Sequence, residues 1–322
     1  MKKVLILFGG DSNEHLISCK SAKSILENID RNKFDVTSVG IKKDWFIFND
    51  DYEYLENGNW LDSNITKIDN IVDYLKNFDV VFPIIHGNTC EDGKIQGMLD
   101  LFNIKYVGCD SYSNMISYDK DLTKIILNHY NVLQVNSITI NKDYNIKNII
   151  NKLKFPMIVK PSKCGSSIGI NKVTNKSELN CAIKEALKYD NKIIVEEFIT
   201  ARELECAVRE DKKIITSDIG EIVTNCDFYD YDAKYNDASS KTIVSADIPK
   251  KIKKEIQRLS KKIFCCLGCK GMARIDFFYN DKIYFNEINT IPGFTSISMF
   301  PMLLTNKSFT YEDLITSIIE NA

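Results

Sequence analysis

The most informative stretch of this chain reads MARIDFFYNDKIYFNEINTIPG and runs from residue 272 to residue 293. β-Favouring residues on either side of a central Asn-Asp pair predict a hairpin of two strands. Alternation along a strand places the cation of Arg274 on the same face as Asp276. The same rule places Glu287 and Asn289 together on the partner strand. Two carboxylates and a carboxamide are hard oxygen ligands, so the hairpin predicts an Mg²⁺ site formed by Asp276, Glu287 and Asn289.

An exposed hairpin with polar side chains facing water is the alternative explanation for each of these residues taken alone. The two strands, however, carry much apolar surface to bury, from Phe277, Phe278, Tyr284, Phe285 and Ile288. Charged groups in such a strand pair need partners, because unpaired buried charge is costly. The set as a whole therefore favours a functional site.

Composition limits the classes of protein to consider. The 322 residues are 44% hydrophobic and 27% charged, which is typical of a globular protein long enough for two or three domains. The net charge of -2 gives no indication of nucleic-acid binding. The first apolar run is too short for a secretion signal, and no run approaches the ~20 residues that span a membrane. We therefore expect a cytoplasmic protein with no nucleic-acid partner and no membrane partner.

The ten cysteines are scattered, and their single cluster is Cys265, Cys266 and Cys269. A zinc site would need a fourth ligand and usually a second pair. We expect reduced thiols, with this cluster packed at the end of a helix.

Three regions follow one another along the chain, with expected boundaries of 1–108, 109–195 and 196–322. The first alternates strands (4–8, 34–41, 79–85, 105–107) with helices (12–28, 93–102), which predicts a parallel sheet covered by helices. Functional loops then belong at the strand C-terminal ends, where residues 9–15 and 86–93 lie. The second region holds a helix near 120–128, strands near 135–140, 157–160 and 168–173, and a helix at 177–189. The third holds a strand at 192–198, a polar loop at 221–241, a long helix at 249–267, the hairpin and a terminal helix.

A second candidate site lies in residues 156–170, which read PMIVKPSKCGSSIGI. An apolar strand ends at Lys160, and the small residues after it can bring backbone N–H groups and serine hydroxyls close to phosphate oxygens. The segment lacks the GxxxxGK[ST] pattern of a P-loop and the GxGxxG dinucleotide fingerprint, and a strand follows it. The alternative for this segment alone is a mobile surface hairpin.

Three weaker signals remain. An apolar strand ends in Glu196 and Glu197 with Glu203 beyond it, which suits adenosine binding but is also typical of an ordinary strand end. The aromatic residues of 228–235, FYDYDAKY, favour a lid that packs when closed over a disordered loop. Lys120 stands near a helix start, where a lysine by itself is typical of a solvated charge.

Together these motifs resemble the ATP-grasp ligases, and within them the D-alanine–D-alanine ligase family. The resemblance covers nearly the whole chain and rests on motifs in the family's order: FGGDSNEH, HGNTCEDG, MIVKPSKCGSSIG, FYDYDAKY, RIDFF and NEINTIPGFTS. It implies a mixed α/β and α+β chain, with an ATP-grasp fold preceded by an N-terminal parallel-sheet (pre-ATP-grasp) domain. It also implies a cytoplasmic homodimer that uses D-alanine, ATP and two Mg²⁺ ions, with Mn²⁺ as an alternative metal.

The resemblance implies a role for each candidate residue. The phosphates of ATP would be held by Lys120, Lys160 and Lys234, under a loop with Ser166 and Ser167. Adenosine would be held by Glu196, the backbone at Glu197, and Glu203, and the two Mg²⁺ ions by Asp276, Glu287 and Asn289. Glu14 would pair with the ammonium of the first D-alanine, and Arg274 with the Gly293 N–H would bind the developing oxyanion. Substrate orientation and lid closure would fall to Tyr235, Ser166 and Ser298.

The implied reaction, which supplies peptidoglycan precursor, has two steps. The carboxylate of the first D-alanine attacks the γ-phosphorus, which gives an acyl phosphate and ADP. The amine of the second D-alanine then attacks that carbonyl, and phosphate leaves. Phosphoryl transfer requires cations on the phosphate oxygens, the tetrahedral intermediate requires fixed donors, and the acyl phosphate requires protection from water by a lid.

The chain departs from the family pattern at three places. Residues 88–90, Asn-Thr-Cys, replace a stretch that is usually Gly-rich, Cys164 replaces a residue that is more usually polar, and Ile297 replaces a frequent His. Relatives that use D-serine tend to carry a basic residue at the place of Met299, so the methionine favours D-alanine. The absence of His from FYDYDAKY disfavours D-alanyl-D-lactate synthesis.

Other functions stay open. The nearest is a D-alanine–D-serine ligase of a glycopeptide-resistance type, and another is an ATP-binding regulatory protein that has lost catalysis. A nicotinamide-dependent oxidoreductase would rest on Gly9-Gly10 after the first strand and leaves the C-terminal motifs unexplained.

Overall fold

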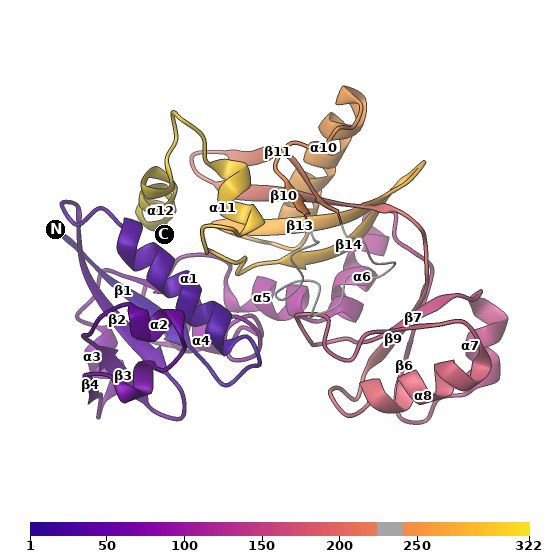
Figure 1. Ribbon diagram of the computed structural model, residues 1–322, viewed down its shortest axis with the longest axis horizontal. Coiled ribbons are helices and arrows are strands. Elements are labelled where there is room, and N and C mark those ends of the chain that lie inside the picture. Colours follow the sequence, from indigo (N-terminus) through magenta and orange to yellow (C-terminus); the bar gives the residue numbers. More distant parts are fainter. Residues whose placement is uncertain (224–240) are drawn as a thin grey trace.

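Three sheets organise the chain in the computed structural model, which describes residues 1–223 and 241–322 (Figure 1). The strand orders are β4-β3-β2-β1-β5, β6-β9-β7-β8 and β12-β11-β10-β13-β14. The expected lid at 228–235, with Lys234 and Tyr235, lies outside the described residues. Among the residues that the structure describes, none of the helices is long and apolar enough to cross a membrane.

The first sheet has a parallel core, as predicted, formed by β1 (Lys2–Gly9), β2 (Phe34–Ile41) and β5 (Val80–Pro83). Two antiparallel strands that were not predicted extend it, β3 (Trp45–Phe48) and β4 (Ile65–Lys67). The short turn between β2 and β3 explains this, because parallel strands need a long crossover connection. The expected strand at 105–107 is reduced to an isolated bridge between Tyr106 and Val81. The helices of this part are α1 (His15–Asn28), α2 (Glu53–Glu56), α3 (Ile71–Leu75) and α4 (Lys94–Leu101), with a 3₁₀ turn at Trp60–Asp62.

The central sheet is antiparallel and carries the predicted Gly/Ser loop between two of its strands. Its strands are β6 (Ser137–Ile140), β7 (Met157–Pro161), β8 (Asn171–Val173) and β9 (Ile193–Glu197), and its helices are α7 (Ile146–Lys152) and α8 (Lys176–Ala186). All five residues of β7 are buried, because the strand lies between β9 and β8 and beneath α8. Strand β8 starts later than the predicted residue 168, since Ser166, Ser167 and Gly169 have positive φ angles that do not suit a strand.

The C-terminal sheet contains the hairpin that the sequence predicts. Its strands are β10 (Arg202–Glu210), β11 (Ile214–Val223), β12 (Lys241–Ile243), β13 (Met272–Tyr279) and β14 (Ile283–Asn289), with helix α10 at Lys250–Cys266. The pairing sets Asp276 opposite Glu287 and Arg274 opposite Asn289. All four polar residues therefore lie at neighbouring positions of one strand pair.

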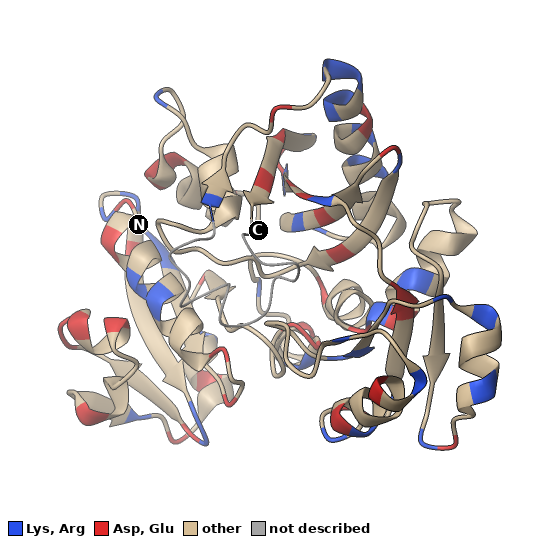
Figure 2. Cartoon of the chain, turned by 45° about the vertical axis from the view of Figure 1, so that its right-hand side comes forward, with Lys and Arg blue, Asp and Glu red and all other residues tan. Residues whose placement is uncertain are grey.

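Several helices pack against a region of the chain other than the one to which the sequence assigns them. The expected boundaries between the regions stay predictions. Helices α5 (Ser111–Tyr118) and α6 (Lys120–His129) follow residue 108 but pack on the C-terminal sheet and α10. Helices α11 (Met299–Leu304) and α12 (Tyr311–Glu320) end the chain yet share the apolar core of the first sheet. The two termini consequently lie near each other (Figure 1), and the Lys2 ammonium donates to the carbonyl of Ile319 at 2.9 Å. In the view of Figure 2, basic and acidic residues are interspersed along all three parts of the chain.

Candidate active site

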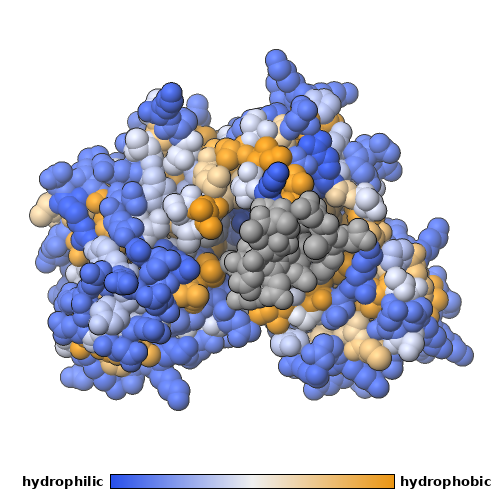
Figure 3. Space-filling model, viewed as in Figure 1, coloured by the Kyte–Doolittle hydropathy of each residue, from blue (hydrophilic) through white to orange (hydrophobic). Residues whose placement is uncertain are grey.

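A cavity of about 1480 Å³ opens where the three sheets meet. In the view of Figure 3, several hydrophobic residues lie around the central part of the molecule. The lining includes every predicted site residue that the structure describes: Glu14, Lys120, Lys160, Ser166, Ser167, Glu196, Glu197, Glu203, Arg274, Asp276, Glu287, Asn289, Gly293 and Ser298. Residues far apart in the sequence thus converge on one cavity.

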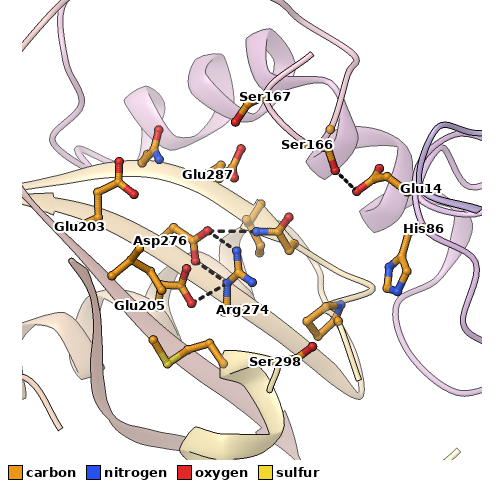
Figure 4. A pocket seen from close by; sticks show the side chains of 18 of the residues that line it. Glu14, His86, Ser166, Ser167, Glu203, Glu205, Arg274, Asp276, Glu287 and Ser298 are labelled. Carbon is orange, nitrogen blue, oxygen red and sulfur yellow. Dashed lines mark hydrogen bonds and ion pairs between the residues drawn. The ribbon is translucent and has the colours of Figure 1, made fainter. Parts of the chain in front are cut away.

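The guanidinium of Arg274 is held by two carboxylates on the floor of this cavity (Figure 4). It donates through Nε and Nη2 to the two oxygens of Asp276, at 2.8 and 2.7 Å, and its Nε lies 3.1 Å from Glu205 Oε2. Burial acts to lower the pKa of Arg274, but Asp276 and Glu205 outweigh it and hold the pKa well above its usual value. The side chain is therefore a permanent cation. Glu205 was not predicted, because it comes from β10, about 70 residues before the hairpin.

The chemistry of the hairpin fits a divalent cation. Asp276 and Glu287 face each other across the strand pair, and Asn289 Nδ2 donates to Asp276 Oδ2 at 3.1 Å. Lys120 Nζ lies 3.8 Å from Glu287 Oε2, so a further cation borders the same carboxylate. Two carboxylates and a carboxamide at adjacent strand positions are the hard donors that Mg²⁺ prefers.

The Gly/Ser loop reaches across the cavity to the N-terminal part of the chain. Ser166 Oγ donates to Glu14 Oε1 at 2.5 Å (Figure 4), and Lys120 Nζ donates to the carbonyl of Cys164 at 2.7 Å. Ser166 and Ser167 have φ angles of +49° and +58°, which are uncommon for residues other than glycine and occur often in functional loops. A Cβ at Gly165 would lie 2.7 Å from Glu14 Oε2, so a larger residue would displace the Glu14 carboxylate.

Lys160 belongs to a buried charge network. Its Nζ lies 2.5 Å from Glu196 Oε1, and Lys124 Nζ lies 3.1 Å from the other oxygen of the same carboxylate. Burial acts to raise the pKa of Glu196, but the two lysines outweigh it and lower the pKa to about 2. The adenosine role of Glu196 stays a prediction, while its carboxylate here pairs with two lysines. Lys124 was not predicted, although its position one turn after Lys120 on α6 was a signal for it.

The predicted adenosine side of the cavity is built from β9 and the segment after it. The Glu197 carboxylate accepts from the backbone N–H of Lys154 at 2.9 Å and from Asn136 Nδ2 at 3.0 Å. Lys172 Nζ lies 3.8 Å from the centre of the Phe198 ring, and both residues line the cavity. This cation–π pair was not predicted, because Lys172 belongs to β8 and Phe198 follows β9, so the two residues are distant in the sequence.

The loop of residues 86–93, predicted to be functional, contributes two further side chains that had no assigned role. His86 is buried, with Nδ1 3.0 Å from the Ile291 carbonyl and Nε2 3.1 Å from Ser21 Oγ. Burial, followed by the neighbouring charge of Glu14, raises the pKa of Glu91 well above its usual value. The loop therefore presents a weakly acidic carboxyl group and an imidazole to the cavity.

Gly293 and Ser298 lie together after the hairpin. Ser298 Oγ accepts from the Thr295 N–H at 3.1 Å and lies 2.7 Å from Thr295 Oγ1. A Cβ at Gly293 would lie 2.7 Å from Ser298 Oγ, so a larger residue would displace the Ser298 hydroxyl. Met299, the next residue, is buried against Gly220 of β11.

Comparison with known proteins identifies the family. The models described as "D-ala D-ala ligase N-terminus" and "D-ala D-ala ligase C-terminus" match residues 3–109 and 122–320. The chain is 42% identical to the D-alanine–D-alanine ligase of Caldicellulosiruptor bescii, over 99% of this chain and 94% of the relative. Its structure resembles the VanG D-Ala:D-Ser ligase of Enterococcus faecalis with a TM-score of 0.90 and 35% identity, over 99% and 98% of the two chains. It also resembles a D-alanine–D-alanine ligase of Bacillus anthracis complexed with ATP, with a TM-score of 0.80 and 25% identity over 100% and 97%.

These matches confirm the predicted ATP-grasp fold and the expected relationship. Each match extends over nearly the full length of both compared proteins. The chain belongs to the D-alanine–D-alanine ligase family.

Proposed function

We propose that the chain is an ATP-dependent ligase that joins two D-alanine molecules to give D-alanyl-D-alanine, ADP and phosphate for peptidoglycan synthesis. The observation that carries the proposal is the convergence of the hairpin residues, the lysines and the Ser166 loop on one cavity. Family membership and the relatives named D-alanine–D-alanine ligase support it.

In this proposal the first step uses the cationic side of the cavity. Lys120 and Lys160 bind phosphate oxygens of ATP, and Asp276, Glu287 and Asn289 hold two divalent cations. When bound, Mg²⁺ supplies positive charge that stabilises the transferring phosphoryl group. The donor chemistry and the register of the hairpin support this assignment.

The second step uses donors that are already in place. Arg274 is oriented by Asp276 and Glu205, so its charge can stabilise an oxyanion without reorganisation. Glu14 pairs with the ammonium group of the first D-alanine, and its contact with Ser166 supports loop closure over the substrate. Closure excludes water from the acyl phosphate.

Purified protein mixed with ATP, Mg²⁺ and D-alanine should release phosphate and form the dipeptide. Phosphate release no greater than in a control without amino acid would contradict the proposal. ATP binding without ligase or ATPase activity would favour the regulatory alternative.

A D-alanine–D-serine ligase is the second candidate, favoured by the similarity to the VanG D-Ala:D-Ser ligase. The apolar side chain of Met299 argues against it, because its thioether sulfur is only a weak acceptor for a hydroxyl group. Competition between D-serine and D-alanine for the second position, followed by product analysis, decides between the two.

Location and assembly are further parts of the proposal. We infer a cytoplasmic enzyme that works as a homodimer, as expected from the family resemblance. Sedimentation of the purified protein at several concentrations tests the dimer.

A further inference from the structure

A ring of hydrogen bonds encloses the backbone on both sides of Gly293. The Phe294 N–H donates to Ser21 Oγ at 3.3 Å. Ser21 Oγ lies 3.1 Å from His86 Nε2, and His86 Nδ1 lies 3.0 Å from the Ile291 carbonyl oxygen. Both side chains are buried, with Ser21 0% and His86 4% exposed. The Gly293–Phe294 peptide is therefore tied to α1, and the Ile291–Pro292 peptide is tied to the loop after β5.

The chemistry of the partners sets the direction of every bond in this ring. A carbonyl oxygen can only accept, so His86 Nδ1 must carry the proton that faces Ile291. In the neutral ring Nε2 then accepts from the Ser21 hydroxyl, whose oxygen accepts from the Phe294 N–H. The opposite tautomer would place two acceptors 3.0 Å apart. Glu91 Oε1 lies 4.0 Å from Nδ1, so it is a more distant acceptor than the Ile291 carbonyl oxygen.

Two more contacts hold the same loop from other elements. The Tyr311 hydroxyl of α12 donates to the Phe294 carbonyl, and Thr290 Oγ1 donates to Asn114 Oδ1 of α5 at 2.6 Å. The Phe294 ring is fully buried and contacts Phe82 edge-on. Gly293, by contrast, is partly exposed and lines the cavity. The loop is thus anchored on both sides of the residue that borders the substrate space.

We propose that Ser21 and His86 are positioning residues that fix the Gly293 N–H for acyl transfer. The inference rests on the proposed ligase function, in which this N–H binds the oxyanion. Removal of an oxyanion donor costs about 10²–10³ in kcat, and misplacement by a fraction of an ångström costs less. Loss of the ring displaces the donor without removing it, so a loss of about 10-fold is expected.

Ser21→Ala tests the ring in the full-length protein. It should lower kcat for dipeptide formation about 10-fold and leave the KM for ATP unchanged, because Ser21 does not line the cavity. Ser38→Ala is the matched control. Ser38 is buried like Ser21, but it lies in β2 and donates to the Phe48 carbonyl, away from the cavity. It should keep the wild-type kcat. Wild-type kcat in Ser21→Ala, or an effect on KM for ATP alone, would overturn the proposal.

A double-variant cycle separates positioning from general weakening of the fold. Ser21→Ala combined with His86→Asn should be about as slow as His86→Asn alone, because both changes break the same ring. Losses that multiply would contradict the ring.

The ¹⁵N NMR spectrum of the wild-type histidine rings gives a measurement that needs no activity. His86, assigned by its loss in His86→Asn, should show a protonated Nδ1 and an unprotonated Nε2. An Nε2-protonated ring would refute the inference even if the ligase is active. If the expected tautomer is found but no dipeptide forms, the proposed function fails while the ring stands.

Discussion

Arg274 illustrates how one side chain depends on its immediate partners. Its planar guanidinium group donates to both oxygens of Asp276, while the Glu205 carboxylate contacts it from the neighbouring strand. Such a two-point contact fixes orientation as well as charge, which a lysine cannot do. The alternation of side chains along β13 predicts that Arg274 lies beside Asp276. The pairing of β10 with β13 brings Glu205 to the same guanidinium.

Arg274→Lys should lower kcat for dipeptide formation by about 10²–10³, because the charge remains but the oriented donors are lost. Steady-state kinetics with D-alanine and ATP measure the effect. Arg209→Lys, on the neighbouring strand β10 and outside the cavity lining, serves as the control and should retain activity. Equal kinetics for the two variants would contradict the role of Arg274.

Thr89 occupies a backbone conformation that suits glycine, with a φ angle of +89°. Strain of this kind costs about 1–3 kcal/mol, and glycine gives back about 0.5–1 kcal/mol through its unfolded-state entropy. Thr89→Gly should therefore stabilise the protein by about 1 kcal/mol in urea unfolding. Asn88→Gly, next to it and without a positive φ, should give no gain. A gain in both variants would point to the loop in general and not to strain at Thr89.

Helix α6 and strands β7 and β9 are joined by the buried network of Lys124, Lys160 and Glu196. One carboxylate between two lysines leaves the group with a net positive charge, directed at the cavity that the proposed nucleotide would fill. The network therefore links the packing of three elements to the electrostatics of phosphate binding.

Glu196→Gln should lower the free energy of unfolding at pH 7 by about 3–5 kcal/mol, because two buried lysines lose their counter-charge. Urea unfolding measures the change. Glu185→Gln, which removes an exposed partner of Lys188, is the control and should leave the unfolding midpoint unchanged.

The same network predicts a pH dependence. The pKa of Glu196 is lowered from 4.5 to about 2, so its contribution to stability is complete above pH 4.5 and is lost as the pH falls toward 2. The stability difference between wild type and Glu196→Gln should consequently shrink between pH 4.5 and pH 3. A difference that stays constant over this interval would argue against a charged Glu196 in the fold.

Residues from all three parts of the chain line the cavity. The last helix, α12, packs in the apolar core of the first sheet. A ligand that fills such a cavity contacts all three parts at once, so it should stabilise the entire fold and not one part. The contacts of Ser166 with Glu14 and of Tyr311 with Phe294 already connect these parts.

A non-hydrolysable ATP analogue with Mg²⁺ should raise the melting temperature in a single transition. At a concentration 100 times Kd, binding stabilises the folded state by about 2.7 kcal/mol. Asp276→Asn should reduce the part of the shift that depends on Mg²⁺, as measured by scanning calorimetry with and without the metal. A shift that is independent of Mg²⁺ in the wild type would contradict the metal assignment.

The sequence by itself determined the local pieces of this protein. The bounds of β13 agree with the prediction, and the two-residue period correctly places Arg274 beside Asp276, because strand alternation and turn chemistry are local properties. The motifs also identified the family and the ATP-grasp fold. The tertiary structure alone decided which distant elements meet: Glu205 beside Arg274, Lys124 beside Glu196, and Ser21 with His86 around Gly293. These contacts depend on how three sheets and their helices pack together, and no local period in the chain carries that information.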